Sequence, residues 1–96
     1  MTLHHIPDTA SLFSQWYGML ATGGRLYFAD LDVEDGSFHG DNTGVFHLGF
    51  DRSLLKRFLR DAGFKDIRDV TAATVQRVAE GTGTRGFLVF LIIARK

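Results

Sequence analysis

The sequence contains no cysteine and a single proline among its 96 residues. The absence of cysteine excludes disulfides and thiolate metal ligands. The 11 basic and 11 acidic residues cancel, so no basic field attracts nucleic-acid phosphates and we expect no nucleic-acid partner. The longest apolar run, residues 87–94, is too short to cross a bilayer as a helix, and no basic segment followed by an apolar run marks a signal peptide. We therefore expect a cytoplasmic protein with no membrane partner.

The first third of the chain contains one helical pattern between two apolar segments. Residues 1–6 form a short apolar stretch that we predict to be the tail of a strand. Asp8 is a good helix N-cap, and the apolar residues after it recur at helical spacing. Gly23 and Gly24 end this segment. Residues 25–31 are rich in aromatic and aliphatic side chains, which predicts a strand covered on both faces.

The remaining two thirds contain a second helix and two further strands. Residues 36–49 hold several glycines and no periodicity, which predicts a loop of functional length. Asp51 and Gly63 bracket an amphipathic helix as its N-cap and its left-handed closing residue. Residues 67–78 and 87–94 are predicted strands joined by a glycine-rich turn, the second of them buried on both faces. The alternation predicts an α/β fold with an antiparallel end.

Short motifs along the chain resemble those of a known family. Residues 3–6, Leu-His-His-Ile, are followed by Asp8 and an amphipathic helix. Residues 23–26, Gly-Gly-Arg-Leu, then open a strand that reaches Asp30. In this order and spacing the motifs resemble the fourth and fifth strands of class I S-adenosylmethionine (SAM)-dependent methyltransferases.

The resemblance continues to the end of the chain. Gly-Phe at residues 49–50 precedes a helix that closes with Asp-Ala-Gly-Phe at residues 61–64, which is similar to the helix and sixth strand of that family. Residues 87–93 resemble its seventh strand, which lies antiparallel between the fifth and sixth. The resemblance implies a partial Rossmann-like sheet of the fifth, seventh and sixth strands, the last two an antiparallel hairpin, with two flanking helices. Residues 1–96 would then be a single truncated domain, the C-terminal half.

The resemblance does not extend to the part of the family's fold that binds most of the cofactor. SAM binds there to a glycine-rich turn after the first strand and to an acidic residue that ends the second. The Gly-Thr-Gly stretch at residues 81–83 lacks a strand–turn–helix context and suits a hairpin. The resemblance thus implies methyl transfer from SAM to an unidentified acceptor, with this chain alone binding no SAM and showing no activity. The alternative is a non-catalytic remnant that acts as a dimerisation or interaction module.

Candidate site residues lie where the resemblance places the carboxyl ends of the strands, the usual ligand-binding edge of such sheets. His4 and His5 are the catalytic candidates, because a histidine near the transferable methyl group can orient or deprotonate an acceptor. The cofactor-binding candidates are Leu3, His4 and Asp8. The substrate-binding candidates are Asp30, Asp32, His39 and His47, the two histidines lying in the predicted loop. The alternatives are histidines that only cap a strand, and a solvated loop anchored by its own aromatic residues.

We predict neither a metal site formed by the histidines nor a binding surface formed by the cations of the second helix. The four histidines fit no common zinc spacing, and adjacent residues of a strand point to opposite faces, so we predict no metal site. The cations of the second helix are predicted to form a solvated face: Lys56, Arg57 and Arg60.

The strand at residues 25–31 suggests a protein partner. In the family it pairs with the fourth strand, which is reduced here to residues 1–6. An apolar edge strand is a template for association, and a net charge of zero does little to oppose it. We therefore predict a homodimer, a domain-swapped oligomer, or capture by a separate N-terminal half.

Overall fold

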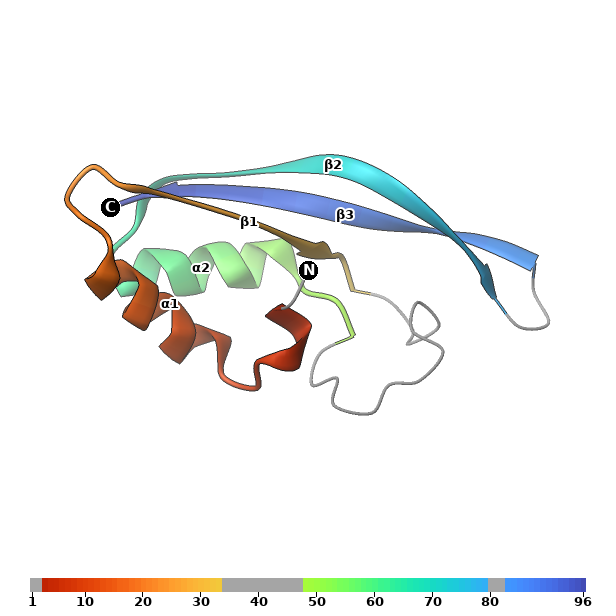
Figure 1. Ribbon diagram of the computed structural model, residues 1–96, viewed down its shortest axis with the longest axis horizontal. Coiled ribbons are helices and arrows are strands. Elements are labelled where there is room, and N and C mark those ends of the chain that lie inside the picture. The colour runs from red at the N-terminus through yellow and green to blue at the C-terminus, as the bar shows by residue number, and fades with distance from the viewer. Residues whose placement is uncertain (1–2, 34–47, 80–82) are drawn as a thin grey trace.

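The computed structural model describes residues 3–33, 48–79 and 83–96 (Figure 1). Its elements are η1 (Leu3–His5), α1 (Thr9–Met19), β1 (Arg25–Leu31), α2 (Arg52–Ala62), β2 (Lys65–Ala79) and β3 (Gly83–Arg95). The described strands form one sheet in the order β1-β3-β2, and α1 and α2 lie together against one of its faces (Figure 1). The protein is therefore α/β, with a small three-stranded sheet and two helices.

β3 lies in the centre of the sheet and runs antiparallel to both neighbours. Its pairing with β1 extends from Arg25↔Arg95 to Leu31↔Val89. β2 and β3 form the hairpin expected at the end of the chain, and its ladder is interrupted by register shifts near Lys65 and Thr71. Since both outer strands are antiparallel to β3, they run parallel to each other. The bounds of β1 coincide with the predicted residues 25–31, and β2 begins two residues before the predicted 67.

The starts of both helices and the end of α2 follow from local side-chain chemistry, as predicted, whereas α1 ends at Met19, before the predicted Gly23 and Gly24. The Asp8 carboxylate accepts a hydrogen bond from the Ser11 amide at 3.0 Å at the start of α1. Asp51 accepts from the Ser53 amide at 2.9 Å at the start of α2. Gly63 closes α2 with a φ of 113°, and there a Cβ atom would lie 2.8 Å from the Tyr17 ring. Glycine at this position therefore permits both the left-handed cap and the close approach of the two helices.

The prediction of a strand tail at residues 1–6 was wrong for the part that the structure describes. Leu3–His5 forms a short 3-10 turn, and the Ile6 amide donates to the Leu3 carbonyl at 3.0 Å. The Leu3 side chain is buried in the core. The described strands include no neighbour for this segment. The turn forms a local backbone hydrogen bond and buries an apolar side chain, which is the compact alternative to an unpaired strand.

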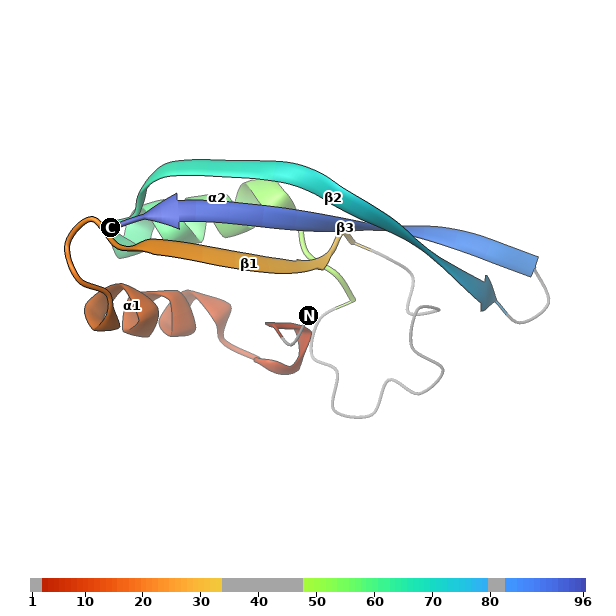
Figure 2. The same ribbon diagram turned by 45° about the horizontal axis from the view of Figure 1, so that its top comes forward.

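The prediction that β1 is covered on both faces was wrong for most of the strand and holds only at its end, where the adjacent residues Asp30 and Leu31 are both buried. Tyr27 on β1 is 55% exposed, because both helices lie on the opposite face of the sheet (Figure 2). For β3 the prediction holds at the middle of the strand, where the adjacent residues Val89 and Phe90 are both buried. The main core lies between the sheet and the helices and contains Leu3, Phe13, Phe50, Leu55, Leu59, Phe64, Phe90, Ile92 and Ala94.

Candidate functional site

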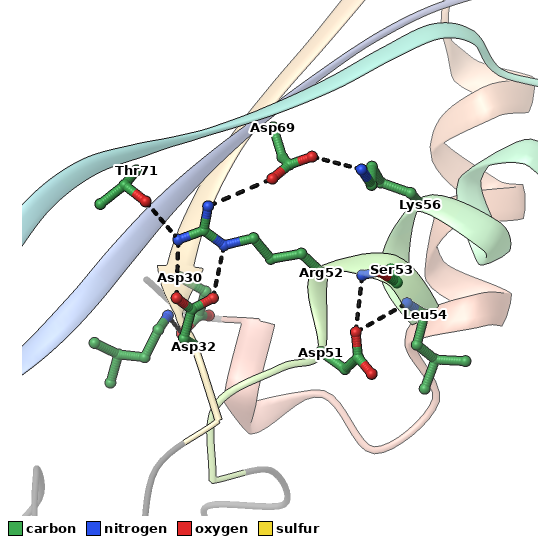
Figure 3. Close-up of polar contacts among 10 residues, drawn as sticks. Asp30, Asp32, Asp51, Arg52, Ser53, Leu54, Lys56, Asp69 and Thr71 are labelled. Atoms are coloured by element: carbon green, nitrogen blue, oxygen red, sulfur yellow. Dashed lines mark hydrogen bonds and ion pairs between the residues drawn. The ribbon is translucent and has the colours of Figure 1, made fainter.

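Polar side chains from three elements converge where β1 ends and α2 begins (Figure 3). This cluster, called the Arg52 cluster below, contains Asp30, Asp32, Asp51, Arg52, Lys56, Asp69 and Thr71. The aspartates at 30 and 32 belong to the end of β1 and the position after it, whereas Asp69 and Thr71 come from β2. The cluster therefore joins segments that are far apart in the sequence.

The two residues before the α2 N-cap, Gly49 and Phe50, fix the start of α2 against the end of β1. The Phe50 amide donates to the Leu31 carbonyl at 2.9 Å, and Phe50 forms a parallel bridge with Asp32. Gly49 enters this bridge with a φ of 75° and lies directly against the backbone of Asp32. The Phe50 side chain is buried in the core. The first turn of α2 is thus held at a defined position beside the β1 end.

Arg52 is the centre of the cluster. Its guanidinium binds both carboxylate oxygens of Asp32, with Nε donating to Oδ1 at 2.7 Å and Nη2 to Oδ2 at 2.8 Å. Nη2 also donates to Thr71 Oγ1 at 2.9 Å, and Nη1 to Asp69 Oδ2 at 3.4 Å. The guanidinium carbon lies 5.5 Å from the centre of the Phe90 ring. The planar fork of arginine suits this bidentate contact, which a lysine cannot reproduce.

These contacts fix the ionisation of Arg52 and Asp69. The hydrogen bond to Asp32 raises the pKa of Arg52 above its ordinary value, against the opposing effect of burial. The hydrogen bond from Lys56 lowers the pKa of Asp69, and Arg52 contributes in the same direction. A general base works best when its pKa lies near the working pH. Asp69 and Arg52 are therefore permanently charged at neutral pH and serve as positioning groups, not as proton carriers.

The ion pair between Lys56 and Asp69 gives a prediction on pH dependence. Lys56 Nζ lies 2.6 Å from Asp69 Oδ1. Because Asp69 has a lowered pKa in the folded protein, the pair contributes stability above the ordinary value of 3.8 and loses it as the pH falls through the folded value. We expect Lys56→Met to lower the unfolding free energy by about 0.5–1 kcal/mol at pH 7. Urea titrations should show this difference shrinking below about pH 4.

Arg57→Met is the matched control for Lys56→Met, since Arg57 is an exposed cation of the same helix. Its effect on the unfolding free energy should be small and should not follow the titration of Asp69. A Lys56→Met difference that stays constant down to pH 2 would contradict the assignment of this ion pair.

The structure places the predicted site residues in different surroundings. Asp30 is fully buried and its carboxylate accepts from the Leu31 amide at 2.8 Å, two positions before the ion-paired Asp32. Leu3 is a core side chain, and Asp8 caps α1. His5 is exposed, and the η1 segment that contains it lies on the same side of the sheet as the helices (Figure 1). The side chain of His4 and the residues His39 and His47 lie outside the described part of the chain.

The sequence analysis missed four members of the cluster: Arg52, Lys56, Asp69 and Thr71. One signal was available: a cation in the first turn of a helix opposes the helix dipole, and Arg52 occupies the first position of α2. Such a residue requires counter-charges from elsewhere in the fold. The prediction of a solvated face holds for Arg57 and Arg60, which are exposed. It was wrong for Lys56, which pairs with Asp69.

The surface beside the cluster is an open depression of about 460 Å³ lined by Asp32, Val33, Phe50, Asp51 and Arg52. These residues do not fit SAM by themselves. Gly49, the glycine of this region that allows a close backbone approach, already contacts Asp32, and the Asp32 carboxylate is occupied by Arg52. Within residues 3–33, 48–79 and 83–96, no group of three or more histidines and carboxylates is arranged to hold a metal ion.

Comparisons with known proteins do not assign the chain to a family. No protein-family model matches the chain, and no curated protein matches it. Neither helix in the described residues has the length and apolar character needed to cross a membrane. The functional argument therefore depends on the order of the strands and on the Arg52 cluster.

Proposed function

We propose that the chain is the C-terminal part of a class I SAM-dependent methyltransferase fold, with the end of β1 on the side that receives the methyl acceptor. The observation that supports this proposal is the strand order β1-β3-β2, in which the last strand lies antiparallel between two strands that are parallel to each other. The resembling family places its fifth, seventh and sixth strands in this order. The position of both helices on one face agrees with it (Figure 1).

Within this proposal the Arg52 cluster is a structural clamp beside the ligand-binding edge. Arg52 ties the β1 end to β2 through Asp32 and Thr71, and the Phe50 bridge ties it to α2. A rigid edge is what an acceptor needs in order to be held in line with a methyl group. Of the candidates beside this edge, His5 is exposed to an acceptor, whereas Asp30 is buried and the Asp32 carboxylate is bound by Arg52. Because the described residues do not fit SAM, we assign no catalytic step and expect the chain alone to be inactive.

Titration with S-adenosylhomocysteine tests the proposal. Calorimetry of the isolated chain should detect no micromolar binding, since the glycine-rich turn of the family has no counterpart here. At millimolar ligand, amide shifts in a ¹⁵N–¹H spectrum should change at η1, at Asp8 and at the end of β1, where the resemblance places cofactor and acceptor. Adenosine monophosphate, which lacks the amino-acid part, is the control ligand. Shifts confined to other residues, or equal responses to both ligands, would contradict the proposal.

A second candidate function is a non-catalytic interaction module. The observation that favours it is the outer edge of β1, which has no neighbouring strand among the described residues. The two functions differ in the shift experiment, because an interaction module requires no response to S-adenosylhomocysteine at the end of β1.

A further inference from the structure

The two edges of the sheet differ in how they are protected against strand pairing. On the β2 edge the ladder contains two register shifts, and Asp66 has a positive φ of 51°. Bulges and charged residues of this kind prevent an edge from adding a further strand. β1 pairs with β3 in unbroken register over Arg25–Leu31 and contains neither a bulge nor a proline. The β1 edge is therefore the one that can accept a strand.

The hydrogen bonds of the sheet identify which peptide groups of β1 point outward. The Asp32 amide donates to the Leu88 carbonyl, and the Lys96 amide donates to the Gly24 carbonyl. The backbone N–H and C=O groups of even-numbered residues in this segment thus point toward β3. Because the direction alternates along a strand, the peptide groups of Arg25, Tyr27 and Ala29 face away from the sheet. The Leu31 carbonyl faces the same way but is already taken by the Phe50 amide.

We propose that a second copy of this chain docks on the β1 edge, with the two β1 strands antiparallel and Tyr27 opposite Tyr27 of the copy. Among the described residues, Arg25, Tyr27 and Ala29 have no strand partner on this side, and the three positions are symmetric about Tyr27. This register places Arg25 opposite Ala29 of the copy, and each such pair exchanges two hydrogen bonds. If the two strands were centred on a residue other than Tyr27, one of the three positions would have no partner, or the second copy would collide with the Phe50 bridge. The result is a continuous six-stranded sheet with a two-fold axis.

The helix beside this edge suits a second copy because it contains no charged residue of its own. The Lys96 ammonium lies at its C-terminal end, where it binds the Tyr17 and Leu20 carbonyls. Residues 9–24 contain no charged residue, and this range includes all of α1. α1 lies below β1, on the face of the sheet that both helices cover (Figure 2). Its exposed residues are Ser11, Ser14, Gln15, Gly18 and Met19. Met19 is 81% exposed, an unusual state for a large apolar side chain.

Self-association brings identical surfaces together, so a charged side chain on the two-fold axis would lie next to the same charge of the second copy and be repelled. The β1–α1 flank avoids this repulsion, because Arg25, the charged residue at the start of β1, lies opposite an alanine in the proposed register. The exposed cations Arg57 and Arg60 lie on α2, behind the β2–β3 side of the sheet (Figure 2). The paired tyrosines add a cross-strand aromatic contact at the axis. This inference concerns the isolated chain, because in the resembling family the same edge pairs with the fourth strand.

A single cysteine tests the register, because the natural sequence contains none. Directly opposed, hydrogen-bonded residues of an antiparallel pair have Cα atoms about 5.5 Å apart, within the range that a disulfide bridges. Tyr27→Cys should therefore form a covalent dimer in most of the protein under mild oxidation. Val70→Cys is the matched control, since Val70 is 49% exposed on the same face of the sheet but on β2. A Tyr27→Cys variant that does not cross-link, or a Val70→Cys variant that cross-links equally, would overturn the proposal.

Light scattering provides an independent test. The unmodified chain should have twice its monomer mass of 10.7 kDa at high concentration. Ala29→Pro removes an outward amide without removing a hydrogen bond to β3, and edge strands tolerate proline at such positions. This variant should remain folded by circular dichroism and should shift to the monomer mass. A monodisperse wild-type monomer, or a folded Ala29→Pro variant that is still a dimer, would refute docking at this edge.

Discussion

Replacing Gly49 with alanine is expected to lower the free energy of unfolding by about 3 kcal/mol, among the largest effects for a single substitution. A Cβ atom at this position would lie 1.9 Å from the carbonyl oxygen of Asp32 and 2.8 Å from the Cα atom of Val33. These neighbours are backbone atoms and cannot rotate away. The φ of 75° adds strain, because side chains rarely adopt it. Relief would require the connection before α2 to move away from β1, which would break the Phe50 bridge.

Gly18→Ala is the matched control for Gly49→Ala. Gly18 lies within α1, and a Cβ atom there would meet no other atom within 4 Å. Alanine in a helix interior is favoured over glycine by about 0.5–1 kcal/mol, so this variant should be slightly more stable than the wild type. Urea denaturation of both variants gives the comparison. A Gly49→Ala protein with wild-type stability would show that the connection does not approach Asp32 as described.

The parts of the fold that the sequence predicts well are those set by neighbouring residues. Asp51 and Gly63 bound α2 because an N-cap carboxylate and a left-handed glycine each act within one turn. The strand bounds 25–31 follow from a glycine pair and an apolar run. The order of the strands is different: the expectation of β1-β3-β2 came from the resemblance, since local patterns carry no information on which strands pair.

The parts that the sequence did not predict depend on contacts between distant segments. The sequence of residues 1–6 is typical of a strand, but strand structure requires a neighbour, and without one in the described residues Leu3–His5 forms a turn. Arg52 meets Asp32 across 20 residues and Thr71 across 19. Spacing patterns do not identify such partners. The unfavourable position of Arg52 at a helix start was the one local sign that its charge is used elsewhere.

Replacing Arg52 with methionine is expected to lower the free energy of unfolding by about 2 kcal/mol, between the effects of surface and fully buried ion pairs. The side chain is 19% exposed, so its contacts are only partly screened by water. Methionine retains much of the apolar stem but removes the donors to Asp32, Asp69 and Thr71. Asp32 would then remain partly buried without its bidentate partner. For a chain of this length, the loss corresponds to a fall in melting temperature of about 8–16 °C.

Arg57→Met controls for the loss of one positive charge and should change the melting temperature little, because Arg57 is exposed. Arg52→Lys separates charge from geometry. A lysine retains the positive charge but lacks the planar fork that meets both oxygens of Asp32, so it should recover less than half of the lost stability. The variant pair Arg52→Met and Asp32→Asn completes a double-mutant cycle, for which we expect a coupling energy of about 1 kcal/mol or more. Additive effects, or full recovery by lysine, would show that the two-oxygen contact does not hold the end of β1 against α2.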